Sequence, residues 1–415
     1  MKKILIVEDS KLFSKLLSKR VADDFQTECV VCTTYRETVS LLEKTPEQFL
    51  LAVLDLNLPD AADGEVVDLV LSKGIPAVVV TARMDAKIRE RVLDKQVLDY
   101  IMKGPHTLDQ LTETTKRYLR NQNITLLVVD DSELFRKQTR SVLETQHYTV
   151  LEAANGISAL KIIKENADIS LVMTDYHMPK MDGFELTAEI RKIRPMDKLA
   201  IIGTSAYGNP LLSSQFLKRG ANDFLTKPYF EEELICRINQ NVEIIERIAQ
   251  LHEASIKDQL TQLYNRRYFF GTGEKLFENA RRQNLDIAIA MIDIDNFKSV
   301  NDTYGHGDGD VALIEIAEIL QKIFRASDIV TRFGGEEFII MAVNMSPDHR
   351  ENHFETVRQK IESLVIETAQ NKFNTTVSIG VATSLQDTLD SMVQKADELL
   401  YQAKKGGRNR VVIEQ

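Results

Sequence analysis

The residues of this chain that could do chemistry are mostly carboxylates placed at the ends of apolar runs. In the segment RASDIVTRFGGEEFII, from Arg325 to Ile340, two glycines and two glutamates interrupt strand-forming residues. Glycine weakens a strand interior and adjacent carboxylates repel each other, so this placement suggests a function. A second acidic pair, Asp293 and Asp295, lies near the end of the apolar run IAIAMIDIDNF. Carboxylates from two such elements can hold a divalent cation between them.

A tight hairpin would explain the two glycines. The runs IVTRF and FII are predicted strands, and Gly334 and Gly335 are expected in the turn between them, where residues without a Cβ let the backbone approach a bulky anion. Glu336 and Glu337 would then stand at the hairpin tip, beside the strand that carries Asp293. The alternative is an acidic turn that binds nothing.

Basic residues near this hairpin could hold phosphates. Lys298 follows the acidic run, and Lys404 and Arg408 lie at the end of the last predicted helix, LDSMVQKADELLYQAKK, which stops at two glycines. Metal-binding carboxylates beside such cations suit metal-assisted nucleotidyl transfer. Because the GGEEF run, the D-x-D-x-F-K run and this basic end agree, nucleotidyl transfer is favoured over the acidic turn.

The N-terminal half contains an internal repeat with acidic residues of its own. LIVEDSKLF, from Leu5 to Phe13, recurs as LVVDDSELF, from Leu127 to Phe135, and later segments recur in the same order. Each copy is about a domain long, so the repeat is a duplicated domain. β-Branched runs alternate with helical patterns, which predicts a parallel sheet with helices on both faces in each copy.

Three kinds of polar residue follow the predicted strands of each copy. Chemistry in parallel sheets gathers beyond the carboxyl ends of the strands, where three carboxylates would converge and require a cation such as Mg²⁺. A hydroxyl and a lysine follow the next strands, and the whole set suits phosphoryl transfer onto an aspartate. The residues are Glu8, Asp9, Asp55, Thr81 and Lys103 in copy one, and Asp130, Asp131, Asp175, Ser205 and Lys227 in copy two. The alternative, polar loop ends, is disfavoured by their common order in both copies.

Residues 1–240 resemble the receiver domains of two-component response regulators. The resemblance implies a flavodoxin-like doubly wound fold, and phosphorylation of Asp55 and Asp175 by a sensor histidine kinase or phosphotransfer protein. The implied Mg²⁺ sites are Glu8, Asp9, Asp55 and Asn57 in copy one and Asp130, Asp131, Asp175 and His177 in copy two, and the implied switch residues are Thr81, Tyr100, Lys103, Ser205, Phe224 and Lys227. Copy one departs from the pattern at Gly104 and in an acceptor loop one residue longer, yet lacks no key group.

A segment from Phe230 to about Ile256 has neither glycine nor proline and is predicted to be one helix. Its apolar positions follow a heptad-like spacing that His252 interrupts once: Ile235, Ile238, Val242, Ile245, Ala249, His252 and Ile256. Two interpretations remain open. The first turns would pack on their own domain, and the later turns could form a two-helix contact between protomers.

Residues 257–415 resemble the GGDEF family, the diguanylate cyclases. Gly334 to Phe338 reads GGEEF, an active variant of the signature, and DIDNFKSVNDTYGHGDGD and DQLTQLYNRR match further motifs, with Gln262 where glycine is common. The resemblance implies an α+β fold similar to nucleotidyl cyclase catalytic domains. The expected domains are receivers at 1–121 and 122–243, a helical, coiled-coil-like linker at 244–257 and the GGDEF domain at 258–415.

The resemblance also implies that two GTP molecules condense to cyclic di-GMP and two pyrophosphates, with Mg²⁺ or Mn²⁺ as cofactor. Asp293, the carbonyl of Ile294 and Glu336 would hold the metal, Glu337 would support it, and Glu336 would help to deprotonate the 3′-hydroxyl. The expected substrate contacts are Asn301 and Asp310 at the guanine, Lys298, Lys404 and Arg408 at the phosphates, and His306, Gly334 and Gly335. Because each domain presents one GTP, the active form would be a homodimer.

Arg325 and Asp328 form an R-x-x-D pair just before the hairpin. As an exposed ion pair it would have little energetic worth. The spacing also matches the product-binding site of the family, which implies feedback inhibition by cyclic di-GMP, and this interpretation is favoured. Arg358 is a candidate second arginine for the same ligand.

Composition narrows the class of protein. The 415 residues, 43% of them hydrophobic, fit two to four domains, and a formal net charge of −10 argues against a broad basic surface for nucleic acid. No run approaches a membrane span or a signal peptide, so a cytoplasmic protein is expected. Cys29 and Cys32 form a lone CxxC, for which packing on opposite faces of a strand is favoured over zinc or redox chemistry.

The alternative function is a cyclic di-GMP sensor without synthesis, which the intact metal carboxylates disfavour.

Overall fold

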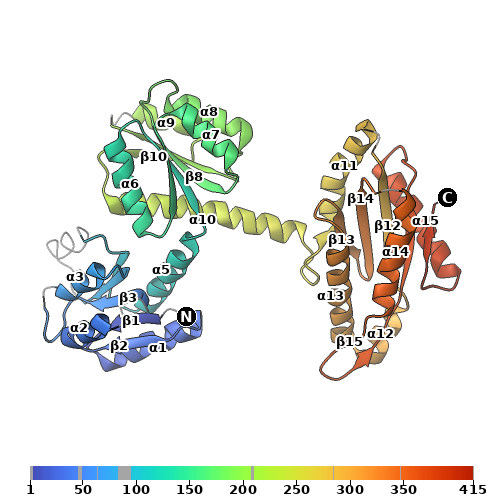
Figure 1. The fold of residues 1–415 in the computed structure, drawn as a ribbon, viewed down its shortest axis with the longest axis horizontal. Coiled ribbons are helices and arrows are strands. Elements are labelled where there is room, and N and C mark those ends of the chain that lie inside the picture. The colour runs from blue at the N-terminus through green and yellow to red at the C-terminus, as the bar shows by residue number, and fades with distance from the viewer. Residues whose placement is uncertain are drawn as a thin grey trace. The chain divides into compact units, whose positions relative to one another are not determined.

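The computed structural model describes residues 3–44, 49–62, 64–82, 95–206, 210–283, 285–345 and 347–414. The chain divides into two compact units, Met1–Ala249 and Gln250–Gln415. Figure 1 shows the elements of each unit coloured by position in the chain. No helix in the described ranges has the length and apolar character needed to cross a membrane.

The first unit begins with a five-stranded parallel sheet whose strand order is β2-β1-β3-β4-β5. Its strands are β1 (Lys3–Val7), β2 (Cys29–Cys32), β3 (Phe49–Asp55), β4 (Ala77–Thr81) and β5 (Asp99–Met102). Its helices are α1 (Lys11–Phe25), α2 (Tyr35–Lys44), α3 (Glu65–Ser72) and α5 (Thr107–Asn121). This strand order is that of flavodoxin-like doubly wound domains.

Alternation along the strands gives this sheet an apolar core on each face. Leu5 and Val7 of β1 belong to one buried cluster, whereas Ile4 and Ile6 belong to the other. Cys32 packs in the first cluster and Cys29 against the second. The two thiols are free and lie on opposite faces of the sheet, as the strand spacing predicts.

The second copy repeats this architecture, with the strand order β10-β9-β8-β6-β7. Its strands are β6 (Thr125–Val129), β7 (Thr149–Ala153), β8 (Ile169–Asp175), β9 (Ala200–Ser205) and β10 (Asp223–Thr226). Its helices are α6 (Glu133–Thr145), α7 (Gly156–Glu165), α8 (Gly183–Ile193), α9 (Pro210–Lys218) and α10 (Glu231–Ile256). Read in chain order, both sheets have the same topology, which confirms the predicted doubly wound fold of each copy.

Helix α10 buries an apolar face in its first turns but not in its last turns. Ile238, Val242 and Ile245 are buried in the core of the second copy. Ala249 and His252, which continue the predicted heptad seam, are exposed. The first turns therefore pack on their own domain, as one of the two interpretations requires, while the contact between protomers stays a prediction.

The second unit is built on a mixed six-stranded sheet with the order β11-β13-β14-β12-β17-β18. Its strands are β11 (Tyr264–Asn265), β12 (Ile287–Ile294), β13 (Ile329–Gly334), β14 (Glu337–Val343), β17 (Val377–Ala382) and β18 (Val411–Ile413). Strands β15 (Ile366–Glu367) and β16 (Lys372–Phe373) form a separate ribbon. The helices are α11 (Arg266–Gln283), α12 (Phe297–Tyr304), α13 (His306–Ile323), α14 (Pro347–Glu362) and α15 (Leu389–Lys405).

Two apolar clusters cover the two faces of this sheet. One holds Ile316 of α13 and Val357 of α14, and the other holds Phe277 of α11 and Ala396 of α15. A Cβ on Gly380 of β17 would lie 2.1 Å from the backbone nitrogen of Leu400, so the absence of a side chain there lets α15 approach the sheet closely. This approach determines where the end of α15, with Lys404, meets the acidic end of β12.

Candidate active site and phosphorylation sites

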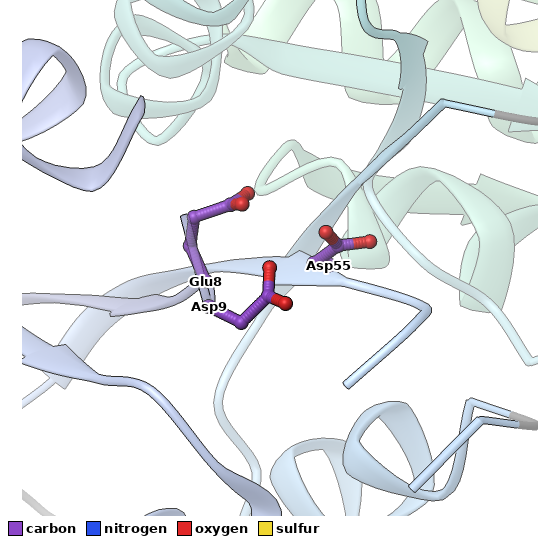
Figure 2. A group of neighbouring side chains, drawn as sticks. All are labelled: Glu8, Asp9 and Asp55. Carbon is purple, nitrogen blue, oxygen red and sulfur yellow. The ribbon is translucent and has the colours of Figure 1, made fainter. Parts of the chain in front are cut away.

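The first copy gathers its acidic residues at the carboxyl ends of β1 and β3. Glu8, Asp9 and Asp55 each bring a carboxylate oxygen within 4.8 Å of the others, and Figure 2 shows these side chains around one space. Lys103, which follows β5, places its Nζ 2.8 Å from Glu8 and 2.6 Å from Asp55. The structure therefore brings together the predicted acid pair, phospho-acceptor and lysine, which lie far apart in sequence.

Burial and charge shape the protonation of this cluster. Burial raises the pKa of Glu8, with a further contribution from nearby Asp55, while Lys103 opposes the shift. Burial lowers the pKa of Lys103, but its hydrogen bonds to Asp55 and Glu8 outweigh this and raise the pKa overall. Three carboxylates beside a single ammonium leave excess negative charge, and oxygen ligands of this kind fit Mg²⁺.

The remaining predicted residues of the first site lie around the same strand ends. Thr81 is the buried last residue of β4, and Tyr100 lies on β5. The backbone nitrogen of Asn57 donates to the Asp55 carboxylate at 3.1 Å, so the loop turns over the acceptor. In the longer acceptor loop, Asp60 accepts hydrogen bonds from the first backbone nitrogens of α2 at 2.8 and 3.1 Å. The extra length of this loop is therefore anchored on a helix N-terminus.

The second copy repeats the arrangement. Nζ of Lys227 lies 2.6 Å from both Asp130 and Asp175. A pocket opens over these groups, and its lining residues are Asp130, Asp131, Ser132, Phe135, Asp175, His177, Ala206 and Lys227. Both sites thus pair a buried acceptor aspartate with a lysine and an acid pair.

The switch positions of the second copy also take their predicted places. Ser205 is the buried last residue of β9, and Phe224 lies on the neighbouring β10. The hydroxyl of Thr204 donates to Asp175 at 3.3 Å, a contact that sequence reasoning missed. The Lys227–Pro228 peptide bond is cis, at the Lys-Pro step that copy one lacks.

In the C-terminal unit, the acidic hairpin lies directly beside β12. Asp293 and Glu337 are cross-strand partners in the antiparallel pair of β12 and β14, and the backbone nitrogen of Ile294 lies 3.4 Å from the carbonyl oxygen of Glu336. Cross-strand partners have closely spaced side chains, so the three predicted metal-site residues share one corner of the sheet.

The hairpin turn is one residue later than the sequence suggests. Gly334 ends β13 and Glu337 begins β14, so Gly335 and Glu336 form the two-residue turn. Gly335 has a φ of 52°, which favours glycine. A Cβ built on Gly334 or Gly335 meets no atom within 4 Å, so the surface above the turn is open, while the approach of an anion to it stays a prediction.

The charges at this corner are only partly balanced. Burial raises the pKa of Asp293, the neighbouring Glu336 adds to this, and Lys404 opposes it from 2.8 Å. Burial also raises the pKa of Glu337, with Asp293 as the next cause. A divalent cation would relieve this excess negative charge, so the donor set fits Mg²⁺ with Asp293, the Ile294 carbonyl and Glu336 as ligands.

The predicted guanine-binding residues lie where α12 meets α13. Asn301 is on α12, and Asp310 is exposed on α13. Gly309 packs so closely against Asn301 that an added Cβ would lie 2.0 Å from its Oδ1. Sequence reasoning matched Gly309 to the family motif without seeing this packing role. The remaining predicted substrate residues are exposed side chains: Lys298, His306 and Arg408.

Sequence reasoning missed an arginine that braces the hairpin. The guanidinium of Arg332 on β13 donates to the carbonyl of Gly335 at 3.0 and 2.9 Å, and to Asp258 at 3.0 Å. Asp258 belongs to the opening motif DQLTQLYNRR, which the sequence singled out for another reason. The only sequence signal for this role was an arginine two residues before the paired glycines.

The R-x-x-D pair forms a turn. The carboxylate of Asp328 accepts from the backbone nitrogen of Arg325 at 3.0 Å, and the side chain of Arg325 is exposed. Arg358, the candidate second arginine, bonds to Glu355, Glu362 and Asn409. The proposed binding of product by these arginines stays a prediction.

Two family descriptions match this chain. The response regulator receiver domain matches residues 4–116 and 126–239, and the diguanylate cyclase, GGDEF domain matches residues 255–410. Together with two lysine-bridged acidic pockets on doubly wound sheets, these matches define a class: the chain belongs to the response regulator receiver family and carries a C-terminal GGDEF domain.

Parts of the chain align with particular relatives and with a solved structure. The chain is 31% identical over 301 residues to Response regulator PleD of Caulobacter vibrioides, an alignment that covers 69% of this chain and 65% of PleD. It is 38% identical over 189 residues to Diguanylate cyclase A of Treponema denticola, covering 44% of this chain and 51% of that protein. A crystal structure of a two-component system response regulator/GGDEF domain protein aligns at TM-score 0.53 with 38% identity, covering 59% of this chain and all of that one. The chain therefore spans less than two thirds of the length of these curated relatives.

Proposed function

We propose that this protein is a diguanylate cyclase that condenses two GTP molecules to cyclic di-GMP and two pyrophosphates, under the control of its receiver domains. The observation that carries the proposal is the corner formed by Asp293, Glu336 and Glu337, with Lys404 2.8 Å from Asp293. It supports a GTP site. We further propose a cytoplasmic location, because GTP and the phosphodonor are found there. The proposed domain boundaries are those expected from the sequence, with the linker at 244–257.

The residues divide the work by chemistry. Mg²⁺ or Mn²⁺, when held by Asp293, Ile294 and Glu336, supplies charge stabilisation at the α-phosphate. Asn301 and Asp310 accept from the N–H groups of guanine, which adenine does not offer as a pair. The phosphates are held by Lys298, Lys404 and Arg408, with His306 and the two glycines at the same site.

Bond formation requires a second copy of the domain. The 3′-oxygen of one GTP attacks the α-phosphorus of the other, the bond to pyrophosphate breaks, and the hydroxyl proton leaves with help from Glu336. The reciprocal attack by the second 3′-oxygen closes the ring and releases the second pyrophosphate. Each domain holds one GTP, so a homodimer brings the two reactants together. We propose that phosphorylation of Asp55 or Asp175 promotes this dimer, with the exposed later turns of α10 in contact.

The direct test is incubation of the purified protein with GTP and Mg²⁺, with and without beryllofluoride as a phosphoryl mimic. We expect cyclic di-GMP in both conditions and more with beryllofluoride. Glu336→Ala should lower the rate at least 100-fold, since a metal ligand is lost. Well-folded wild-type protein that makes no cyclic di-GMP in either condition would reject the proposal.

The second candidate is a cyclic di-GMP sensor, favoured only by the R-x-x-D turn. We propose that Arg325 binds product and mediates feedback inhibition. Arg325→Ala should then relieve inhibition by added cyclic di-GMP, while Glu336→Ala should still bind it. If neither the wild type nor Glu336→Ala synthesised cyclic di-GMP while both bound it equally, the sensor interpretation would be correct.

A further inference from the structure

The two aspartates of the D-x-D run point to different partners. Asp293 pairs with Lys404 at the acidic corner, whereas Asp295 is buried at 5% exposure and is held by other groups. Ser378 donates to Oδ1 of Asp295 at 2.6 Å, and Thr376 donates to Oδ2 at 2.7 Å. The spacing of the two carboxylates alone would suggest a second metal ligand, but the hydroxyls already engage both oxygens of Asp295.

A third donor links Asp295 to the loop after α15. The backbone nitrogen of Asn409 donates to Oδ2 of Asp295 at 3.0 Å, across 114 residues of sequence. This loop is unusual because Arg408 and Asn409 both have a positive φ, 64° and 45°. Such conformations are costly for residues other than glycine unless the surroundings hold them.

The side chain of Asn409 is held from its other side as well. Nη1 of Arg358 donates to its Oδ1 at 2.6 Å, and its Nδ2 donates to Glu362 at 2.6 Å. Asp295, the residue directly after β12, and two residues of α14 therefore fix this loop between them. Arg408 directly precedes Asn409 in this loop. Lys404 lies in the last turn of α15, before the loop begins.

We propose that Asp295 is a positioning residue that holds the loop of Arg408 and Asn409, and so places the cations that bind the triphosphate of GTP. The inference rests on the proposed function, because it needs GTP as the ligand. A buried carboxylate that accepts three hydrogen bonds suits this role, since charge-assisted bonds are stronger than neutral ones.

Asp295→Asn is the test, because the amide keeps the shape of the side chain but removes the negative charge that strengthens all three hydrogen bonds. We expect the KM for GTP to rise about tenfold, with kcat within about threefold and the Mg²⁺ activation constant unchanged. In calorimetry with Mg²⁺, 3′-deoxy-GTP, which cannot react, should bind about tenfold more weakly, whereas GMP should bind as to the wild type. Asp390→Asn, an exposed aspartate of α15, removes the same charge and should change none of these values.

Asn409→Gly is a second variant in case Asp295→Asn does not fold. It removes both side-chain anchors, keeps the backbone nitrogen and tolerates the positive φ, so it should weaken 3′-deoxy-GTP selectively over GMP. A shifted Mg²⁺ constant in Asp295→Asn would instead make Asp295 a metal ligand and overturn the proposal. So would equal weakening of GMP and 3′-deoxy-GTP, or no change in either variant. A wild type without activity that still binds 3′-deoxy-GTP would reject the proposed function and not this inference.

Discussion

At the scale of single residues, glycines, which lack a Cβ, shape the candidate site as much as charged side chains do. A Cβ on Gly335 would meet no atom within 4 Å, whereas the space that a Cβ on Gly309 would need is occupied by the side-chain amide of Asn301. Two glycines of one domain thus have opposite structural roles: Gly335 leaves free space above the turn, and Gly309 makes room for the side chain of Asn301.

Gly309→Ala should displace the amide of Asn301, because the new methyl would lie 2.0 Å from its Oδ1. Overpacking costs about 1–3 kcal/mol, and about 1.4 kcal/mol is tenfold in affinity, so we expect the KM for GTP to rise about tenfold. Steady-state kinetics measures this. Gly307→Ala on the same helix is the matched control, since its Cβ would meet no atom within 4 Å. Equal effects of the two substitutions would contradict the packing role.

The thiols of the CxxC pair should be poorly reactive. Burial, followed by the nearby charge of Glu28, raises the pKa of Cys29 to about 11, and burial raises the pKa of Cys32 as well. A raised thiol pKa means little thiolate at neutral pH, and thiolate is the reactive form. With Ellman's reagent at pH 8, the exposed Cys236 should react first, and Cys29 should accelerate only at strongly alkaline pH. Fast reaction of all three thiols in folded protein would disagree.

At the scale of elements, the acidic corner is held by strands and helices that meet from distant parts of the chain. β12 and β14 pair so that Asp293 faces Glu337, and α15 packs tightly on β17 through Gly380. Arg332 then ties the hairpin turn to Asp258, where the GGDEF domain begins. Through the guanidinium of Arg332, the start of the domain is therefore linked directly to the hairpin turn.

Arg332→Lys should weaken this tie, because an ammonium cannot reproduce the forked contacts of a guanidinium. We expect kcat to fall about three- to tenfold, corresponding to the loss of about one hydrogen bond. Arg247→Lys, which alters an exposed arginine of α10 paired with Glu243, is the matched control and should be neutral. Unchanged turnover in Arg332→Lys would show that the tie does not matter for catalysis.

The same contact predicts a pH dependence of stability. Burial raises the pKa of Asp258, but hydrogen bonds from Thr261 and Arg332 outweigh it and lower the pKa below the ordinary 3.8. The ionised Asp258 therefore stabilises the folded protein fully when the pH is above the ordinary pKa of 3.8. This stabilisation is lost as the pH falls through the lowered pKa of Asp258. Melting temperatures from pH 7 to pH 3 should fall less steeply at the acid end for Arg332→Lys than for the wild type. Parallel curves would contradict this.

At the scale of the whole molecule, the two receivers contact each other at the switch strand of the first. The hydroxyl of Tyr100 on β5 donates to Glu232 in the first turn of α10 at 2.7 Å. The side chain of Gln146 donates to the carbonyl of Leu98, just before β5, at 2.9 Å. The strand that carries the switch aromatic is therefore joined to the second receiver and to the helix that leads toward the GGDEF domain.

Asp55→Asn should consequently remove more of the activation by beryllofluoride than Asp175→Asn, because Asp55 belongs to the receiver whose switch strand contacts α10. We expect activation of Asp55→Asn to fall to nearly none and that of Asp175→Asn to persist in part. Cyclic di-GMP synthesis and light scattering measure turnover and dimerisation. The reverse ranking of the two aspartates would make the second receiver the main input.

Tyr100→Phe should lower activation without changing phosphorylation of Asp55.

The duplicated receivers and the GGDEF domain could be recognised from the amino-acid sequence, because each motif is local and its residues follow strand ends in a common order. The contacts that brace the acidic groups could be seen only in the folded chain. The contact of Arg332 with Asp258 spans 74 residues and that of Asn409 with Asp295 spans 114. Contacts of this kind arise when separate elements pack together, and no periodicity or spacing along the chain encodes which side chains will meet.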